Sequence, residues 1–257
     1  MFFALSSTLS AIILKIKNYK LSFWIDRSAS VAGSPSPIKL GLPIKILLFK
    51  KYFNKSILSI TSAIVYESLI RIIVLFVLAI FFGASHYLVV RYDIILITIF
   101  IILIIMTFIS RYNNGKIISK IKNKILDVKI DLINLFKSYK TNLIITFLQL
   151  ILQLMSIGRI ILLLNSIGVD SLTFVQVSRA VITSNILTTI SMLPGGYVVK
   201  EISLIYLLQL EGIDYSQGVL IALADRSFQL MIAMIFGAFS SVFITKYERR
   251  NSSNIVY

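Results

Sequence analysis

An interruption inside the most apolar part of the chain constrains the fold more than any other feature. Residues 194–201 read Pro-Gly-Gly-Tyr-Val-Val-Lys-Glu and separate the apolar segments 173–193 and 202–210. Proline and glycine break helices, and backbone groups freed at bilayer depth need protein, ligand or cavity water as partners. The interruption therefore predicts a discontinuous helix that lines a polar cavity. The alternative is a short cytoplasmic turn between two ordinary spans.

Composition places the chain among integral membrane proteins. Of its 257 residues, 57% are hydrophobic and 14% are charged, which leaves no room for a soluble catalytic domain of ordinary size. The net charge of +15 comes from basic residues beside apolar segments, which fits anionic lipid headgroups and not nucleic acid. With no cysteine and a single histidine, His86, thiolate or histidine metal sites and a Ser/His/Asp triad are excluded. We expect no metal, no cofactor and no catalytic residue, so the protein is not expected to be an enzyme.

Four apolar segments predict membrane-spanning helices: residues 57–82, 94–109, 143–164 and 217–245. Lysines precede the first of these spans and basic residues follow the last, which places both of those ends in the cytoplasm. The two spans then run in opposite directions. We expect a multi-pass protein of the plasma (inner) membrane with a cytoplasmic C-terminus. The span 143–164 also carries Gln149, Gln153 and Arg159.

Residues 111–142 form the one extended polar stretch. Its apolar residues recur at helical spacing, and lysine supplies most of its charge. This pattern predicts an amphipathic basic helix along the cytoplasmic surface. A surface linker is the simpler interpretation, and docking of a cytoplasmic enzyme partner is the alternative.

The two halves of the chain resemble each other at an offset of 155 residues. The identities pair Ser36 with Ser191, Gly41 with Gly196, Lys45 with Lys200, and Arg71 with Arg226. Opposite orientation and matched interruptions are typical of transporters built from inverted repeats, whose site lies at the repeat interface. We therefore expect an all-α integral membrane protein, a polytopic helical bundle with inverted repeats and broken or re-entrant helices. One transmembrane domain, 1–257, would contain repeat 1 at about 21–83 and repeat 2 at about 172–245. The predicted helix breaks are Pro37, Gly41, Pro43, Pro194, Gly195 and Gly196.

Ionisable residues within or beside these apolar segments are candidates for a site, because a charge at a helix centre costs about 2.5–3.5 kcal/mol on insertion scales. The lysines would hold an anionic phosphate at half-helix ends, the arginines would bind it bidentately, and the carboxylates would recognise a cationic headgroup or carry a proton. The candidate headgroup-binding residues are Lys45, Arg71, Lys200, Glu201, Asp225 and Arg226. The alternative is mutual neutralisation, as between Glu67 and Arg71 at i, i+4.

Several of these residues resemble a known family. Residues 194–201, 212–214 and 224–226 are similar to the Pro-Gly-Gly-x-Gly-x-Arg-Glu region of the flippase-like family, and Pro37-x-x-x-Gly41 and Glu67-x-x-x-Arg71 resemble its first-half pattern. This family comprises the membrane region of lysylphosphatidylglycerol synthase, the multiple peptide resistance factor, and stand-alone relatives. Val198 replaces the third glycine and Lys200 the arginine. The aminoacyl-transferase domain of the full synthase is absent from this sequence, so the resemblance implies the translocation activity alone.

These observations predict a flippase-like protein that moves a phospholipid or lipid-linked headgroup between leaflets. The expected partner is a membrane lipid: an anionic or aminoacylated phospholipid, or a lipid-linked glycan. One alternative is a membrane-embedded lipid or glycan transferase that uses Glu201 or Asp225 as its catalytic carboxylate. The other is a non-catalytic protein that docks a cytoplasmic enzyme through residues 111–142.

Overall fold

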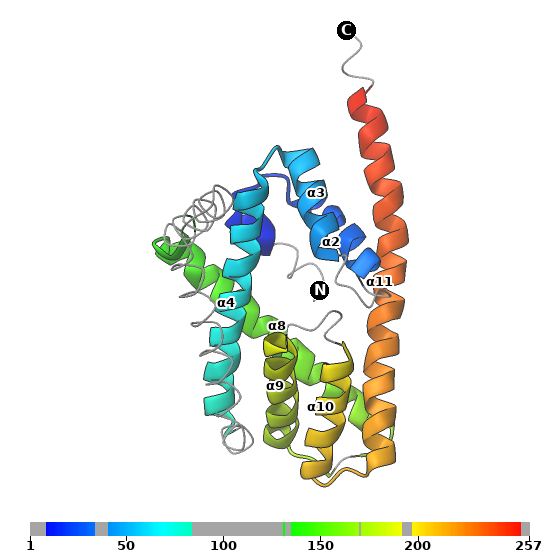
Figure 1. The fold of residues 1–257 in the computed structure, drawn as a ribbon. Coiled ribbons are helices and arrows are strands. Elements are labelled where there is room, and N and C mark those ends of the chain that lie inside the picture. The colour runs from blue at the N-terminus through cyan, green and yellow to red at the C-terminus, as the bar shows by residue number, and fades with distance from the viewer. Residues whose placement is uncertain are drawn as a thin grey trace, which may run out of the picture.

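The structure is a computed structural model that describes residues 9–33, 41–83, 131, 135–169, 171–191 and 197–252. Regular secondary structure in these residues is entirely helical, which confirms the predicted all-α class (Figure 1). The helices are α2 (Tyr19–Gly33), α3 (Gly41–Phe53), α4 (Ile57–Phe81), α8 (Tyr139–Ser166), α9 (Phe174–Ile190), α10 (Tyr197–Leu210) and α11 (Tyr215–Ser252).

Three of the described helices are long and apolar enough to cross a membrane. They are α4, α8 and residues Tyr215–Arg249 of α11, and they match the predicted spans 57–82, 143–164 and 217–245. The predicted span 94–109 lies outside the described residues. Of the predicted basic helix over 111–142, the structure describes residue 131 and residues 135–142, and the last four of these form the first turn of α8.

Local sequence determines where these helices begin. Ser56 caps α4 by accepting a hydrogen bond from the Ser59 N–H at 3.1 Å, and Thr173 forms a capping box with Gln176 at the start of α9. Before α11, the Ser216 hydroxyl donates to Asp214 and holds the pKa of that carboxyl below its ordinary value. Each hydrogen bond satisfies or orients groups at a helix end that lack an intrahelical partner.

Of the predicted helix breaks, the structure describes Gly41 and Pro43, and both lie in the first turn of α3 and not between helices. α2 ends at Gly33 and α3 begins at Gly41. Pro43 lies in the first turn of α3, where its missing N–H would have no intrahelical acceptor in any case. Pro37 and residues 194–196 lie outside the described residues.

Two pairs of short helices lie beside the long helix α11. α2 packs against α3, and α9 packs against α10. The α9–α10 pair lies along the lower half of α11 in Figure 1, and the α2–α3 pair lies along its upper half. α4 packs against α8 and α9 and runs downward in this view, whereas α11 runs upward.

The short helices α2, α3, α9 and α10 differ from the long helices in whether they can cross a bilayer. α2, α3, α9 and α10 contain 15, 13, 17 and 14 residues, which corresponds to about 20–26 Å at 1.5 Å per residue. The hydrocarbon core of a bilayer is about 30 Å thick, so each of these helices is too short to cross it upright. α4 and α8, with 25 and 28 residues, are long enough.

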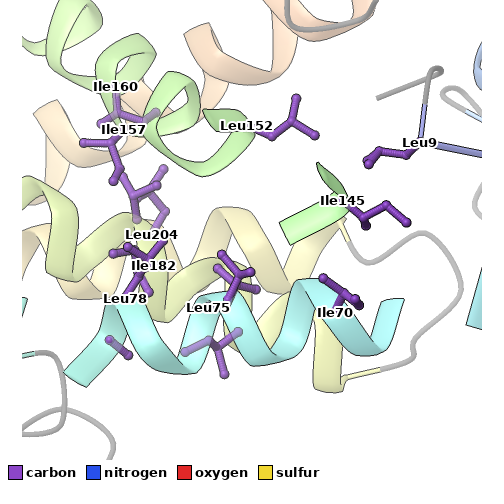
Figure 2. Packing of buried hydrophobic residues seen from close by; sticks show 14 of the residues in the cluster. Leu9, Ile70, Leu75, Leu78, Ile145, Leu152, Ile157, Ile160, Ile182 and Leu204 are labelled. Atoms are coloured by element: carbon purple, nitrogen blue, oxygen red, sulfur yellow. The ribbon is translucent and has the colours of Figure 1, made fainter. Parts of the chain in front are cut away.

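The apolar core lies where α4, α8, α9 and α10 meet. Leu75 and Leu78 of α4, Ile182 of α9 and Leu204 of α10 point toward one another in Figure 2, and all are at most 7% exposed. Large apolar side chains also cover the outer faces of the long helices, among them Ile80, Phe147, Leu162, Phe239 and Val242, which are 63–74% exposed. In a membrane protein, such surfaces face the lipid acyl chains.

A glycine allows α2 and α11 to approach closely. A Cβ atom added at Gly237 would lie 1.8 Å from Cγ2 of Val31 and 2.8 Å from its Cβ. The same two helices also share aromatic contacts: Trp24 stacks on Phe243, and Phe23 packs edge-on against Phe236. Small residues at helix contacts in membranes let backbones pack in this way.

Candidate functional site

Asp225 of α11 connects three helices through its carboxylate. Arg159 of α8 donates from Nε to Oδ1 at 2.6 Å, and Lys200 of α10 donates from Nζ to Oδ2 at 2.9 Å. Gln229, one turn further along α11, donates to Oδ2 at 2.6 Å. Asp225 is only 3% exposed. One buried carboxylate therefore holds two cations, and the cluster carries excess positive charge.

The short helix that carries Lys200 is attached to its neighbour by buried hydroxyl groups. Ser184 of α9 donates to the Lys200 carbonyl oxygen at 3.0 Å, and Ser203 donates to the Ser184 hydroxyl at 3.0 Å. Ser184 is fully buried. These bonds fix the first turn of α10 against α9 and so position the Lys200 side chain.

A cavity of about 290 Å³ opens beside this cluster, between α4, α8, α9, α10 and α11. Three cationic side chains line it: Arg71, Arg159 and Lys200. Among the described residues that line it there is no carboxylate. The other polar lining groups include the side-chain amides Gln149, Gln153, Asn185 and Gln229. The cavity is therefore polar and cationic, although the helices around it are apolar outside.

Gln149 lines this cavity without a hydrogen-bond partner. Its side chain is 0% exposed, and within the described part of the chain neither its amide nitrogen nor its amide oxygen has a partner. A buried polar group left unpaired costs about 1–3 kcal/mol. One helical turn further, Gln153 accepts a hydrogen bond from Asn185 at 3.0 Å.

The charged groups lie near the middle of the long helices. Arg71 is ten residues from the last residue of α4, and Asp225 is ten residues from the first residue of α11. Both helix ends lie at the same side of the molecule in Figure 1. Ten residues correspond to about 15 Å, which is about half the thickness of a bilayer core.

The predicted site residue Lys45 lies in a different cluster. Its Nζ atom is 2.7 Å from Oδ1 of Asp26, and Asp26 also pairs with the adjacent Arg27 at 2.5 Å. Asp26 and Arg27 are both buried. Lys45 therefore has a neutralising partner within the α2–α3 pair and does not line the large cavity.

A chain of polar contacts nevertheless links Lys45 to the cavity. Lys45 donates to the Ser10 hydroxyl at 2.7 Å, and Ser10 donates to Glu67 of α4 at 3.3 Å. Glu67 pairs in turn with Arg71, at 3.4 Å, and Arg71 lines the cavity. Lys45 is therefore connected to the cavity through Ser10, Glu67 and Arg71.

The remaining predicted residues, Glu201 and Arg226, form a pair next to Lys200. Arg226 Nε lies 3.7 Å from Glu201 Oε1, and the two side chains are 21% and 30% exposed. They border a small recess together with Lys200 and Asp225, and they do not line the large cavity. The expected mutual neutralisation is present in this pair and between Glu67 and Arg71.

The structure thus places Arg71 and Lys200 in one cavity, with Asp225 directly behind Lys200. Arg159, Gln149 and Gln153 also line this cavity and are not among the predicted headgroup-binding residues. The signal was available, because Gln149 and Gln153 are four residues apart inside an apolar span and therefore lie on one face. The local sequence does not predict which other helices this face of α8 contacts.

Together, the long apolar helices and the buried polar cavity define a multi-pass membrane protein with a cationic site inside the bundle. The sequence matches the family described as Lysylphosphatidylglycerol synthase TM region over residues 8–237. The chain therefore belongs to this family. The matched region includes every residue described above around the cavity. No curated protein and no solved structure matches the sequence.

Proposed function

We propose that the protein is a flippase-like membrane protein, which moves the polar headgroup of a phospholipid or lipid-linked compound between leaflets while the acyl chains stay in the bilayer. The observation that carries this proposal is a polar cavity with three cationic side chains, placed about halfway along the spanning helices. A cavity of this kind lowers the cost of bringing a phosphate to the bilayer centre, because hydrogen bonds and opposite charge replace its water. Membership of a family named for a phospholipid synthase supports a lipid substrate.

The order of the helices supports an inverted-repeat architecture. A pair of short helices precedes a long one in both α2–α3–α4 and α9–α10–α11, and the two long helices run in opposite directions (Figure 1). The contacts between the two sets are also reciprocal, because α2 packs on α11 while α9 packs on α4. We propose that each short pair is a re-entrant hairpin, as in transporters whose site lies at the repeat interface.

In this proposal the cavity residues have separate roles. Lys200, Arg159 and Arg71 bind the phosphate, and Asp225 positions the first two. Lys45 positions Arg71 through Ser10 and Glu67. Basic residues before α4 and at the end of α11 support a cytoplasmic location for both ends, and we propose a cytoplasmic C-terminus in the plasma membrane.

Lipid movement can be measured with purified protein in liposomes that contain a fluorescent phospholipid. The wild-type chain should expose inner-leaflet lipid to a membrane-impermeant quencher faster than protein-free liposomes do. Lys200→Ala should slow this movement at least tenfold, since charge-assisted hydrogen bonds contribute about 1.5–3 kcal/mol each. Lys50→Ala, at an exposed lysine of α3, is the matched control and should leave the rate unchanged. Movement no faster than in empty liposomes would contradict the proposal.

A transferase is the second candidate, and the geometry favours it less. Asp225 accepts from two cations and one amide, so its carboxylate is poorly suited to act as a base. Glu201 is paired with Arg226 outside the large cavity. Formation of a modified lipid by the purified protein would support the transferase. Inert liposomes would instead support a docking role for residues 111–142, most of which lie outside the described residues.

A further inference from the structure

We propose that a second cavity, between the start of α4 and the start of α8, binds headgroups that carry both a phosphate and an amine. This inference rests on the proposed function and deepens it, because the second cavity receives the headgroup before the large cavity does. The unpaired charges of the second cavity, its hydroxyl groups and its place along α4 support this role.

The second cavity has a volume of about 180 Å³. It lies between residues 12–15, the first two turns of α4, and described residues at and before the start of α8. None of its lining residues lines the large cavity. Its polar lining residues are Lys15, Ser59, Ser62, Asp131, Ser138 and Thr141.

Lys15 and Asp131 bring opposite charges to this cavity without pairing. Neither forms an ion pair with another described residue, whereas each of the three cations of the large cavity has a carboxylate partner. Lys15 is exposed and Asp131 is partly exposed, so both can contact a ligand. An ammonium group and a carboxylate that share a cavity are complementary to a ligand that carries both signs of charge. Its phosphate would pair with Lys15 and its amine with Asp131.

Hydroxyl groups complete the polar lining. Ser138 and Thr141 share a hydrogen bond of 2.8 Å between their hydroxyls, and the Ser59 hydroxyl has no partner among the described residues. A hydroxyl both donates and accepts, so it suits phosphate oxygens and ammonium hydrogens alike. Small-molecule sites usually measure about 300–1,000 Å³, so this smaller cavity fits a headgroup and not the acyl chains.

One face of α4 leads from the second cavity to the large one. Ser59 and Ala63 line the second cavity. Arg71 and Leu75 line the large cavity. Glu67 lies between these pairs at the same spacing of four residues, so all five side chains share one helix face. From Ser59 to Arg71 the helix rises by about 18 Å, so the two cavities lie at different depths.

The second cavity is the nearer of the two to the proposed cytoplasmic side. α4 begins at the end of the molecule at which α11 ends (Figure 1), and the proposed topology places both of these ends in the cytoplasm. A headgroup from the cytoplasmic leaflet therefore meets the second cavity first. It reaches the large cavity when the pair between Glu67 and Arg71 opens, which at 3.4 Å is the longest of the ion pairs around that cavity.

Binding can be measured by protection of a single cysteine, because the chain contains none. Ser59→Cys places a thiol in the second cavity and keeps the Ser56 cap, since that bond uses the Ser59 N–H. In the full-length protein in detergent, water-soluble short-chain phosphatidylethanolamine should slow the reaction with a polar thiol reagent by about tenfold, the effect of one charge-assisted hydrogen bond. Short-chain phosphatidylglycerol, which has the phosphate but no amine, should slow it by less than about threefold.

A short-chain aminoacylated phosphatidylglycerol is measured in parallel. Protection by both amine lipids shows that the phosphate and the amine together are recognised. Protection by the aminoacylated lipid alone identifies the aminoacyl ester as the source of the amine.

Substitutions at the two charges connect the protection to the proposed contacts. In the Ser59→Cys chain, Asp131→Asn should remove the preference for amine lipids, so that all three lipids protect to within about threefold of one another. Lys15→Ala should weaken protection by every lipid. Both positions are at least partly exposed, so these variants should fold. Ser216→Cys, at an exposed serine outside both cavities, is the matched control, and no lipid should slow its reaction.

Two results would overturn the inference: equal protection of Ser59→Cys by phosphatidylglycerol and the amine lipids, or protection by none of them. Lipid movement in liposomes, measured on the same chain, separates this outcome from failure of the proposed function. Movement without protection would remove the second site and leave the proposed function. Protection without movement would remove the proposed function and leave a lipid-binding site.

Discussion

Lys45 and Lys200 occupy equivalent places in the two halves of the chain, but their surroundings differ. Each lies in the first half of a short helix, four residues after a glycine, and each pairs with a buried aspartate, at 2.7 and 2.9 Å. Asp26, the partner of Lys45, belongs to α2 in the same short pair. The partner of Lys200 is Asp225, which belongs to the long helix α11.

This difference determines which lysine borders a cavity. The pair between Lys45 and Asp26 lies within α2 and α3, with Arg27 beside Asp26, and Lys45 is connected to the cavity only indirectly, through Ser10, Glu67 and Arg71. The pair between Lys200 and Asp225 joins α10 to α11 and, through Arg159, to α8, so three helices meet around charged groups. A glycine followed four residues later by a lysine therefore precedes a structural ion pair in one half and a candidate binding site in the other.

The largest test of this comparison is neutralisation of each aspartate. Asp225→Asn and Asp26→Asn each leave two cations without their buried carboxylate, so the free energy of unfolding should fall by about 3–5 kcal/mol in both variants. Thermal unfolding in detergent, followed by size-exclusion chromatography, measures this loss. Asp214→Asn, at an exposed position before α11, is the control. It should change the free energy of unfolding little, since asparagine also caps helices well.

The comparison predicts that the two variants differ in activity. The folded fraction of Asp225→Asn should lose at least 90% of its lipid movement, a tenfold effect for about 1.4 kcal/mol of lost binding. The folded fraction of Asp26→Asn should keep its rate to within about threefold, which corresponds to less than 0.7 kcal/mol on the same scale. Equal loss in both variants would show that the Lys45 cluster is part of the site.

A smaller effect on stability is expected at the contact between Gly237 of α11 and Val31 of α2. Gly237→Ala would place a methyl group against Val31, and overpacking of this kind costs about 1–3 kcal/mol. The melting temperature in detergent should fall, and Val31→Ala in the same chain should restore part of it. Gly218→Ala in the same helix meets Ile205 only at ordinary contact distances of 3.5–3.7 Å. It should be neutral or slightly stabilising, so destabilisation by both alanines would point to helix α11 in general and not to the α2 contact.

The smallest effect on stability is expected at an exposed ion pair between α3 and α11. Lys51 of α3 pairs with Glu248 of α11 at 2.5 Å, but their side chains are 63% and 43% exposed. Exposed ion pairs contribute about 0–1 kcal/mol, so Lys51→Ala should shift the melting temperature by no more than a few degrees. High salt should reduce even that difference, whereas it should not rescue Asp225→Asn. A large destabilisation by Lys51→Ala would mean that this end of the interface matters more than the buried clusters.

Several features of this fold could be predicted because they depend on local properties of the chain. The spans over α4, α8 and α11 follow from the length and hydropathy of continuous segments. The separation of α2 from α3 follows from the prolines and glycine between residues 34 and 45. Arg71, Lys200 and Asp225 stood out because a charge within an apolar segment is costly unless other groups surround it.

The sequence by itself determined that this is a polytopic helical membrane protein with costly charges inside its apolar segments. Only the tertiary structure decided how those charges combine: Asp225 with Arg159 and Lys200 around a cavity, and Asp26 with Lys45 away from it. The physical reason is the distance along the chain over which each property acts. Hydropathy and helix breaking act over neighbouring residues, whereas an ion pair joins residues 66 positions apart, as between Arg159 and Asp225, and forms only where packing brings the two helices together.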